Sequence, residues 1–345
     1  MTPLMTDRAD RITALLAEAG WGEAERDPLP GDASFRRYVR LHGGPRPALL
    51  MDAPPPQEDV RPYVKIDRHL RTLGFSPPEI YAEDIEAGLL VIEDFGDETY
   101  TRRLAAGGDE AEMYALATDV LIALHRAKDA AAIELPAYDE ARLFEEAALL
   151  VDWYLPSIAT QAPQPDMRAE YRALWSGVLP LAEAVPATLT LRDFHVDNLM
   201  WREGQHDLAR CGLLDFQDAV IGPVAYDLVS LLEDARRDVP EPLIDAMTAR
   251  YLDAFPALDR ADFAAAAAML SAQRNCKIIG IFTRLCVRDG KPVYLEHIPR
   301  VWRWLERDLA HPALAPVKAW LDRMIPPEDR RIPEVPPMLR TDCST

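Results

Sequence analysis

The hydrophobic pattern changes its period along the chain and divides it into two kinds of structure. Apolar residues three and four apart predict an amphipathic helix over residues 8–20. Short apolar runs bounded by turn residues then predict strands, with one helix inserted among them. The strands are expected at 36–41, 47–52, 79–84 and 88–94, and the inserted helix at 61–73. The first 95 residues therefore predict a small, mostly antiparallel sheet.

From residue 99 onward the apolar residues follow a helical period. One buried stripe runs from Met113 to Leu124, and later segments repeat its spacing. Helices are expected near 140–155, 166–184, 225–236, 240–254, 259–288, 296–310 and 314–323. Strand signals interrupt them at 188–191, 198–201 and 211–215. We expect an α+β protein with a small antiparallel-sheet lobe over 1–95, a larger helical lobe over 96–325 and a proline-rich tail over 326–345.

The composition of the chain limits the kinds of molecule that it is expected to bind. The chain carries a net charge of −19, which repels nucleic acid and anionic membranes, so we expect neither as a partner and favour a small molecule. No apolar run reaches membrane-spanning length, and the N-terminus is charged where a secretion signal needs apolar residues. The cysteines lack CxxC spacing, which is typical of reduced thiols. We therefore expect a cytoplasmic protein.

Two of the strand signals within the helical region predict a β-hairpin. Strands 198–201 and 211–215 flank a polar segment whose Gly204 suits a turn. Antiparallel pairing outward from this turn places Asn198 and Asp215 at the same open end of the hairpin.

An oxygen-rich end of this kind suits phosphoryl transfer. Mg²⁺ prefers hard oxygen ligands, often one or two protein groups together with phosphate oxygens and water. Asn198 and Asp215 are candidate metal ligands for this reason. Asp193, on the loop that enters the hairpin, could accept a proton from an incoming hydroxyl. We expect these three side chains to converge.

Three motifs resemble those of the aminoglycoside-phosphotransferase-like kinases. The stretch 193-DFHVDN-198 resembles the catalytic loop of that family, and 213-LLDFQD-218 resembles its metal-binding segment. The stretch 222-GPVAYDLVSLL-232 also resembles the family, and the resemblance covers roughly residues 28–310. The order and spacing of the first two motifs make it specific.

This resemblance implies a fold and a mechanism. The fold would be that of a two-lobed, protein-kinase-like aminoglycoside phosphotransferase, with ATP as co-substrate and Mg²⁺ as the metal. Asp193 would be the catalytic base that orients the acceptor hydroxyl. Asn198 and Asp215 would be the metal ligands.

Three further stretches carry a closer resemblance within the family. They are 31-GDASFRRYVRL-41, 50-LMDAP-54 and 273-QRNCKIIGIFTRL-285. They resemble the anomeric sugar kinases of bacterial cell-wall recycling, which phosphorylate N-acetylmuramate and N-acetylglucosamine at C1. The resemblance implies that a small amino sugar and ATP are the partners, in peptidoglycan recycling, and we expect a monomer.

The nucleotide contacts are expected at two places. The resemblance implies that the connector after the last strand of the sheet offers backbone groups to adenine. The loop before residue 37 contains one glycine and is a weak phosphate cradle by itself. The residues expected to bind nucleotide are Ser34, Phe35, Arg36 and Arg37 in the loop, and Glu93, Asp94 and Phe95 in the connector.

One departure from the family concerns the phosphate contact. Related kinases place a lysine on the strand after this loop, but residues 49–52 read Leu-Leu-Met-Asp. The local cations that could replace it are Arg36, Arg37, Arg40 and Lys65. Because neighbouring strand residues point to opposite faces, we expect only one of Arg36 and Arg37 to serve.

The acceptor contacts are expected on the long helix at 259–288. Asn275 and Arg284 lie in an otherwise apolar stretch, where polar groups need partners. Muramate carries a carboxylate, so a basic contact such as Arg274 or Arg284 would suit it.

The remaining polar residues of the motifs are expected to support the structure. His195 would hold the shape of its loop, and Asp197 would face solvent or cap a turn. Asp227 would cap the helix that follows it, as structural support. The triplet Asp94-Phe95-Gly96 is expected to be a connector, because it lies about 100 residues before the catalytic loop.

Three alternatives stay open. The acceptor could be an aminoglycoside, choline or another small alcohol, since an acidic protein suits a cationic acceptor. The missing strand lysine is also compatible with a non-catalytic, kinase-like binding protein. A metal hydrolase built on His195 and Asp197 is disfavoured, since such sites usually need more imidazoles or cysteines.

Overall fold

Two units of different construction make up the chain. The computed structural model describes residues 8–30, 35–158 and 166–334. Unit 1 comprises Met1–Val120 with Val196–Ala219, and unit 2 comprises Leu121–His195 with Val220–Thr345. The predicted lobe boundary near residue 95 stays a prediction. By contacts, the segment up to Val120 and the excursion at 196–219 belong with the sheet.

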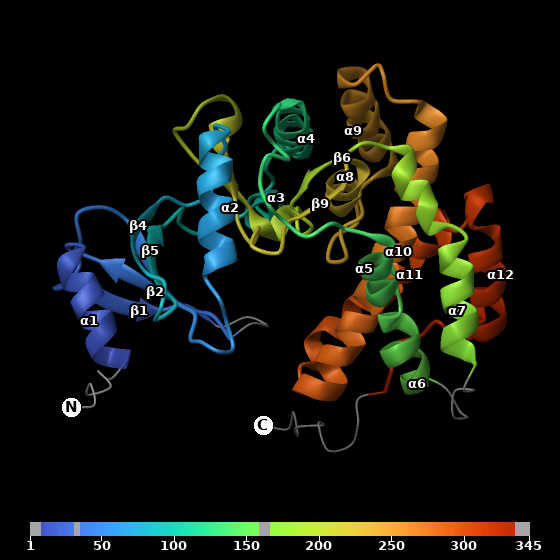
Figure 1. Cartoon of the computed structure of the whole chain (residues 1–345), viewed down its shortest axis with the longest axis horizontal. Helices are drawn as coiled ribbons and strands as arrows, with labels where there is room; N and C mark the ends of the chain where they lie inside the picture. The colour runs from blue at the N-terminus through green and yellow to red at the C-terminus, as the bar shows by residue number, and fades with distance from the viewer. Residues whose placement is uncertain (1–7, 31–34, 159–165, 335–345) are drawn as a thin grey trace. The chain divides into compact units, whose positions relative to one another are not determined.

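Unit 1 is built on a five-stranded antiparallel sheet (Figure 1). Its strands are β1 (Glu25–Pro28), β2 (Arg37–His42), β3 (Ala48–Asp52), β4 (Ile80–Asp84) and β5 (Leu89–Glu93), in the order β1-β2-β3-β5-β4. Its helices are α1 (Arg8–Glu18), α2 (Arg61–Thr72), α3 (Tyr100–Ala105) and the first part of α4 (Glu110–Arg126). Strand β1 was not predicted, because its residues Glu-Arg-Asp-Pro are all exposed and carry no apolar alternation.

Alternation along these strands gives the sheet two different faces. Leu50 and Val91 belong to a core cluster that includes Leu16 of α1. Their neighbours Leu49 and Ile92 point the other way and line a cavity. One face of the sheet is therefore structural, and the other is available to a ligand.

The predicted hairpin is present in unit 1. Strands β7 (Leu199–Trp201) and β8 (Cys211–Leu213) pair in antiparallel register, with Leu199 opposite Leu213. A short 3-10 helix, η3 (Val196–Asn198), precedes β7, and another, η4 (Asp207–Arg210), forms the last part of the connection before β8.

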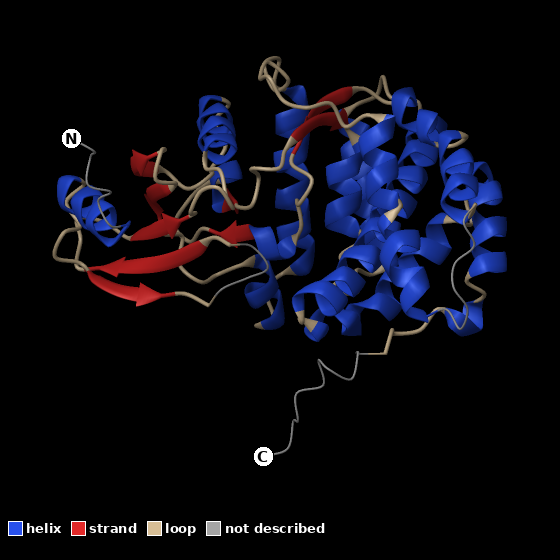
Figure 2. Ribbon diagram, turned by 60° about the horizontal axis from the view of Figure 1, so that its bottom comes forward, coloured by secondary structure: helices blue, strands red, loops and turns tan. Residues whose placement is uncertain are grey.

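Unit 2 is mainly helical (Figure 2). Its helices include α5 (Glu140–Ala147), α6 (Leu155–Ile158), α7 (Met167–Ser176), α8 (Ala225–Leu232), α9 (Glu241–Ala254), α10 (Arg260–Asp289), α11 (Ile298–Asp308) and α12 (Ala315–Met324). The long helix α10 packs against α5, α8 and α11. At Gly280 a Cβ atom would lie 2.3 Å from the backbone of Leu149, so only glycine allows this close approach.

Unit 2 contains a two-stranded sheet of which only one strand was predicted. Strand β6 (Ala187–Thr190) matches the expected signal at 188–191 and pairs with β9 (Val220–Pro223). Strand β9 was not predicted, because its four residues contain a glycine and a proline, which read as a turn. None of the described helices is long and apolar enough to cross a membrane.

Candidate active site

A cavity of about 340 Å³ lies within unit 1. Leu49 and Ile92 of the sheet line it, as do Met200 and Leu214 of the hairpin segment. The volume falls within the range of small-molecule pockets, which are mostly apolar with a few polar groups. Apolar side chains from both elements suit a flat aromatic ring.

The connector after β5 lines the same cavity over residues 93–97. The carboxylate of Asp94 accepts a hydrogen bond of 2.6 Å from Arg40 Nε and one of 2.8 Å from the Gly96 N–H. Its side chain is only 8% exposed. The chain's own donors therefore occupy this carboxylate, which supports a connector role for the Asp94-Phe95-Gly96 triplet.

Two other side chains of the connector, Glu93 and Phe95, hold it against the hairpin segment. Arg202 Nη2 donates to Glu93 Oε1 at 2.6 Å, and the Arg202 guanidinium lies 4.3 Å from the centre of the Phe95 ring. A Cβ atom at Gly212 would lie 2.8 Å from that ring, so the glycine makes room for it. Contacts to adenine would therefore fall to the backbone of the connector.

Asn198 and Asp215 meet at the open end of the hairpin, as the pairing predicts. The Leu214 N–H donates to the Asn198 carbonyl at 2.9 Å, and Asn198 Nδ2 lies 3.5 Å from Asp215 Oδ2. Both residues line the cavity. Asp215 has a φ of +56° and a side chain that is 42% exposed. Positive φ in a non-glycine residue is uncommon and often marks a functional site.

The side-chain oxygens of Asn198 and Asp215 are suitable ligands for a hard cation. Asp215 supplies carboxylate oxygens and Asn198 an amide oxygen, which are ligands that Mg²⁺ accepts. Within the described part of the chain, no group of three His, Cys, Asp or Glu residues forms a metal site. A cation here would need further oxygens, such as those of phosphate. Asp197 accepts a hydrogen bond from Thr101 of α3, so it connects its loop to a helix.

Arg36 is the cation of the loop that approaches Asp215, one of the two predicted metal ligands. Its Nη2 lies 3.5 Å from Asp215 Oδ1, and its Nε lies 3.6 Å from Glu58 Oε2. Glu58 also accepts a hydrogen bond of 3.1 Å from the Phe35 N–H, so one carboxylate holds both the loop and the guanidinium. Arg37 is exposed, in agreement with the opposite orientations expected of neighbouring strand residues. The nucleotide roles stay predictions.

The other candidates near the loop are placed differently. Arg40 is engaged by Asp94 and by Asp97, and Lys65 is exposed. The Phe35 side chain is 67% exposed. Ser34 lies outside the described residues.

Asp193 lies in unit 2, on the loop after β6. Hydrogen bonds from the backbone of this loop to Asp227 hold it in place. Asp227 accepts hydrogen bonds from the Leu191 N–H at 2.6 Å and from the Arg192 N–H at 2.8 Å. The expectation that Asp227 caps its helix is wrong, because the N-cap position of α8 is Val224. Its carboxylate instead holds the backbone just before Asp193, in the predicted catalytic loop, and burial raises the pKa of Asp227 to about 7.

The surroundings of Asp193 keep it ionised. Burial raises the pKa of its carboxyl, but the neighbouring Lys277, His195 and Arg192 more than offset this, so the pKa lies below its ordinary value of 3.8. His195 itself is 8% exposed, and burial lowers the pKa of its ring. Asn198 and Asp215 belong to unit 1, so the convergence of Asp193 with them stays a prediction.

A charged cluster beside Asp193 was missed by the sequence reasoning. Lys277 Nζ lies 3.3 Å from Glu146 Oε2, Arg192 pairs with Oε1 of the same carboxylate, and the Tyr138 hydroxyl donates to it. A signal for Lys277 exists, since it lies one turn after Arg274 on the buried helix α10. No comparable signal marks its partners, which come from other segments.

The predicted acceptor residues have a different environment. Asn275 Nδ2 donates to Asp308 Oδ2 at 2.9 Å and to Glu233 Oε2 at 3.1 Å. Arg274 Nη1 donates to the Glu233 carbonyl at 3.1 Å. Arg284 is half-buried, and burial lowers the pKa of its guanidinium. The first two residues thus hold a buried polar network, and acceptor roles for all three stay predictions.

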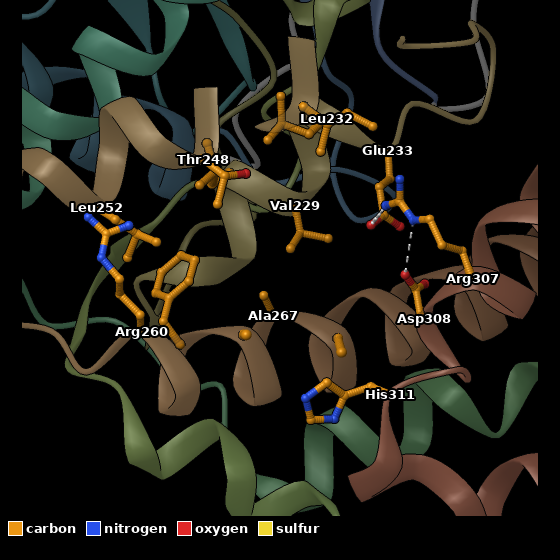
Figure 3. Close-up of a pocket in the computed structure, with 15 residues that line it drawn as sticks. Val229, Leu232, Glu233, Thr248, Leu252, Arg260, Ala267, Arg307, Asp308 and His311 are labelled. Carbon is orange, nitrogen blue, oxygen red and sulfur yellow. Dashed lines mark hydrogen bonds and ion pairs between the residues drawn. The ribbon is translucent and has the colours of Figure 1, made fainter. Parts of the chain in front are cut away.

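This network borders a second cavity, of about 360 Å³, within unit 2 (Figure 3). Its walls are largely apolar and include Val229, Leu232 and Ala267. At one end Arg307 pairs with Glu233, and its Nε lies 3.9 Å from Asp308 Oδ1. None of the predicted site residues lines this cavity.

Comparisons with known proteins identify relatives across most of the chain. The sequence matches the phosphotransferase enzyme family over residues 25–264. It is 38% identical to the N-acetylmuramate/N-acetylglucosamine kinase of Caulobacter vibrioides, over 95% of this chain and 99% of that protein. It is 41% identical to the kinase of the same name from Pseudomonas aeruginosa, over 88% of this chain and 90% of that one.

The fold is also found among solved structures. The aminoglycoside phosphotransferase APH(2″)-Ib in its ADP-bound form matches with a TM-score of 0.58 and 13% identity, over 88% of this chain and 99% of that one. This likeness confirms the predicted kinase-like fold of the aminoglycoside phosphotransferases, with an antiparallel sheet in its N-terminal part and a helical C-terminal part.

Proposed function

Because this chain belongs to the phosphotransferase enzyme family, we propose that it transfers the γ-phosphoryl group of ATP to the anomeric C1 hydroxyl of N-acetylmuramate and N-acetylglucosamine. The observation that carries the proposal is the identity of 38% and 41% with two kinases named for these sugars, over most of the chain. The products would be the sugar 1-phosphate, ADP and a proton. The reaction would return amino sugars from peptidoglycan to cytoplasmic metabolism.

In this proposal the cavity of unit 1 holds the nucleotide. Adenine lies with the apolar side chains of Leu49 and Ile92 and those of Met200 and Leu214, and the backbone of residues 93–95 supplies its hydrogen bonds. Arg36 replaces the absent strand lysine as the phosphate contact, because Glu58 and Asp215 hold its guanidinium. A guanidinium can bind phosphate oxygens with two parallel hydrogen bonds.

Asn198 and Asp215 would hold Mg²⁺ beside the phosphates. When bound, the ion neutralises charge on the phosphate oxygens. The partial exposure of Asp215 and its approach to the Asn198 amide support this assignment.

Asp193 orients the acceptor hydroxyl and takes its proton. Its lowered pKa keeps it ionised at neutral pH, so it is a weak base. A weak base suffices because an anomeric hydroxyl is more acidic than an ordinary alcohol, and because the proton can leave late in a loose transition state. Asp227 holds the backbone just before it.

Phosphorus NMR of the product from N-acetylmuramate and ATP tests the proposal. We expect a phosphorus signal coupled to the anomeric proton. Coupling to the C6 protons instead would contradict the regiochemistry, and absence of ADP formation with both sugars would contradict the function. The methyl glycoside of N-acetylglucosamine, which is blocked at C1 but keeps its C6 hydroxyl, is the matched control and should not react.

The same assay addresses the alternative acceptors. The likeness to an aminoglycoside phosphotransferase, at 13% identity, concerns the fold alone. Choline and an aminoglycoside, tested in parallel with coupled ADP detection, are expected to be poor acceptors compared with the amino sugars.

A further inference from the structure

Beside Asp193, unit 2 contains a largely buried cluster in which two cations share one carboxylate. Lys277 Nζ lies 3.3 Å from Glu146 Oε2, and Arg192 pairs with Glu146 Oε1. The side chains of Lys277, Arg192 and Glu146 are 11%, 13% and 15% exposed. They come from α10, from the catalytic loop and from α5. Packing of distant segments therefore builds this cluster, and it is not a solvated face of one helix.

The cluster has more positive than negative charge. Lys277, Arg192 and Arg274 are all close enough to Asp193 to lower its pKa. Against these three cations stand the carboxylates of Asp193 and Glu146, whose pKa values lie below their ordinary values, and that of the neighbouring Asp227, which is only partly ionised at neutral pH because burial raises its pKa to about 7. In a chain of net charge −19, a local excess of positive charge beside the catalytic base indicates an anionic ligand group.

Hydrogen-bonding capacity at the cluster is also unused. An ammonium group has three donors, and Lys277 directs one to Glu146. The hydroxyl of Tyr226, a fully buried residue, has no hydrogen-bond partner among the described residues, and its ring lies 5.0 Å from that of Tyr138. Buried polar groups are normally paired, so such a group points to a water or a ligand.

We propose that Lys277 binds the carboxylate of N-acetylmuramate and that Glu146 and Arg192 position its ammonium group. This inference rests on the proposed function and names the residue that distinguishes its two acceptors. N-acetylglucosamine lacks the lactyl carboxylate and gains nothing from this contact. Lys277 is therefore a specificity-determining residue for the acidic sugar.

The variant Lys277→Met tests this through the ratio of kcat/KM values for the two sugars. We expect kcat/KM for N-acetylmuramate to fall about 10- to 100-fold more than that for N-acetylglucosamine, the range of a charge-assisted hydrogen bond. The loss with N-acetylglucosamine measures what removal of the Lys277 charge does to Asp193, which is common to both sugars. Glu146 keeps Arg192 and Tyr138 as partners in this variant, so the fold should survive. The conservative variant Lys277→Arg should restore part of the loss.

A substrate analogue gives the same test without a mutation. The carboxamide of N-acetylmuramate keeps the shape of the acid and removes its charge. In the wild-type enzyme it should lose about as much kcat/KM as Lys277→Met loses with the acid beyond its loss with N-acetylglucosamine. In the variant, the acid and the amide should be used about equally well. Two independent, additive losses would overturn the proposal.

Other outcomes separate this inference from the function beneath it. Equal loss with both sugars, or a change confined to KM for ATP, would overturn the role of Lys277 while leaving the kinase reaction intact. No phosphorylation of either sugar by the wild-type enzyme would overturn the proposed function itself. The variant Lys318→Met, which removes a half-exposed lysine from α12, is the matched control and should leave the kcat/KM values for both sugars unchanged.

Discussion

The two cavities have similar volumes, about 340 Å³ in unit 1 and about 360 Å³ in unit 2. They differ in how their polar side chains are paired and how exposed these side chains are. In unit 2, Arg307 pairs with Glu233 at one end of the cavity and lies near Asp308 (Figure 3). Asn275, which does not line the cavity, donates hydrogen bonds to both of these carboxylates. In unit 1, the Asp215 side chain is 42% exposed, although its Oδ1 accepts a hydrogen bond of 2.8 Å from Gln217 Nε2 and lies 3.5 Å from Arg36 Nη2. Volume alone therefore does not identify a ligand site. The state of its polar groups is the better guide.

Unit 1 repeats this contrast in two carboxylates that follow strands. Asp94 has a side chain only 8% exposed, with Arg40 and the Gly96 N–H as donors. Asp215 keeps a more open carboxylate on a left-handed backbone. The same residue type before Phe is thus buried in an ion pair in one place and is partly exposed in the other, where we propose that it binds the metal.

The largest expected effect separates turnover from nucleotide binding. Asp193→Asn should lower kcat by on the order of 10²-fold or more, because the amide cannot accept the acceptor's proton. ATP affinity, measured by calorimetry, should hold, because the nucleotide cavity is built from unit 1. Asp197→Asn is the neighbouring control, with a much smaller expected loss. An Asp193→Asn enzyme with undiminished turnover would remove this residue from the mechanism.

The next effect compares the two carboxylates directly. Asp215→Asn should lower turnover on the order of 10²-fold and raise the Mg²⁺ concentration needed for half-maximal rate. Asp94→Asn should instead lower the free energy of unfolding by about 1–3 kcal/mol, because it weakens the buried pair with Arg40. Its Mg²⁺ dependence should match the wild type. Similar Mg²⁺ titrations for both variants would erase the distinction.

A smaller effect compares the cavities by filling each of them. Leu49→Trp adds bulk to the unit 1 cavity and should raise KM for ATP by about tenfold through steric conflict with the ring. Ala267→Leu adds bulk to the unit 2 cavity and should leave KM for ATP and for sugar near wild-type values. Initial-rate kinetics of the two variants decide this. A raised KM for sugar in Ala267→Leu would give the second cavity a functional role.

The smallest expected effect on activity concerns Asp67, a buried residue of α2 in unit 1. Burial raises the pKa of its carboxyl to about 7, and its Oδ2 has no hydrogen-bond partner among the described residues. The folded state thus holds this proton more tightly than the unfolded state, in which the pKa is near 3.8. By linkage, the contribution of Asp67 to stability falls as pH rises from about 4 to about 7 and is constant above that range.

Asp67→Asn should therefore stabilise the protein more at pH 8 than at pH 5. We expect a difference of roughly 2 kcal/mol between the two conditions, with kinetics unchanged. Urea unfolding of the variant and the wild type at both pH values measures it, and the subtraction removes the other titrating groups. An equal change at both pH values would contradict a raised pKa.

Local patterns allowed much of this molecule to be predicted. Alternation and helical spacing located four strands of the main sheet, the hairpin and the long helix α10, because these depend on nearby residues. Hairpin pairing brought Asn198 and Asp215 together, because their register depends on a short connection. Strands β1 and β9 were not predicted because they have no apolar alternation of their own. Each is a strand because it pairs with a neighbouring strand, β2 and β6 respectively.

The sequence by itself determined the family, the motifs and the local geometry of the candidate metal ligands. Only the tertiary structure decided that Arg36 is the cation held at Asp215, that Asp227 supports the catalytic loop, and that Lys277 pairs with Glu146. Each of these contacts joins segments far apart in the chain. Which residues meet in such contacts depends on how the helices and strands pack against one another. The spacing of residues within one segment gives no information about that packing.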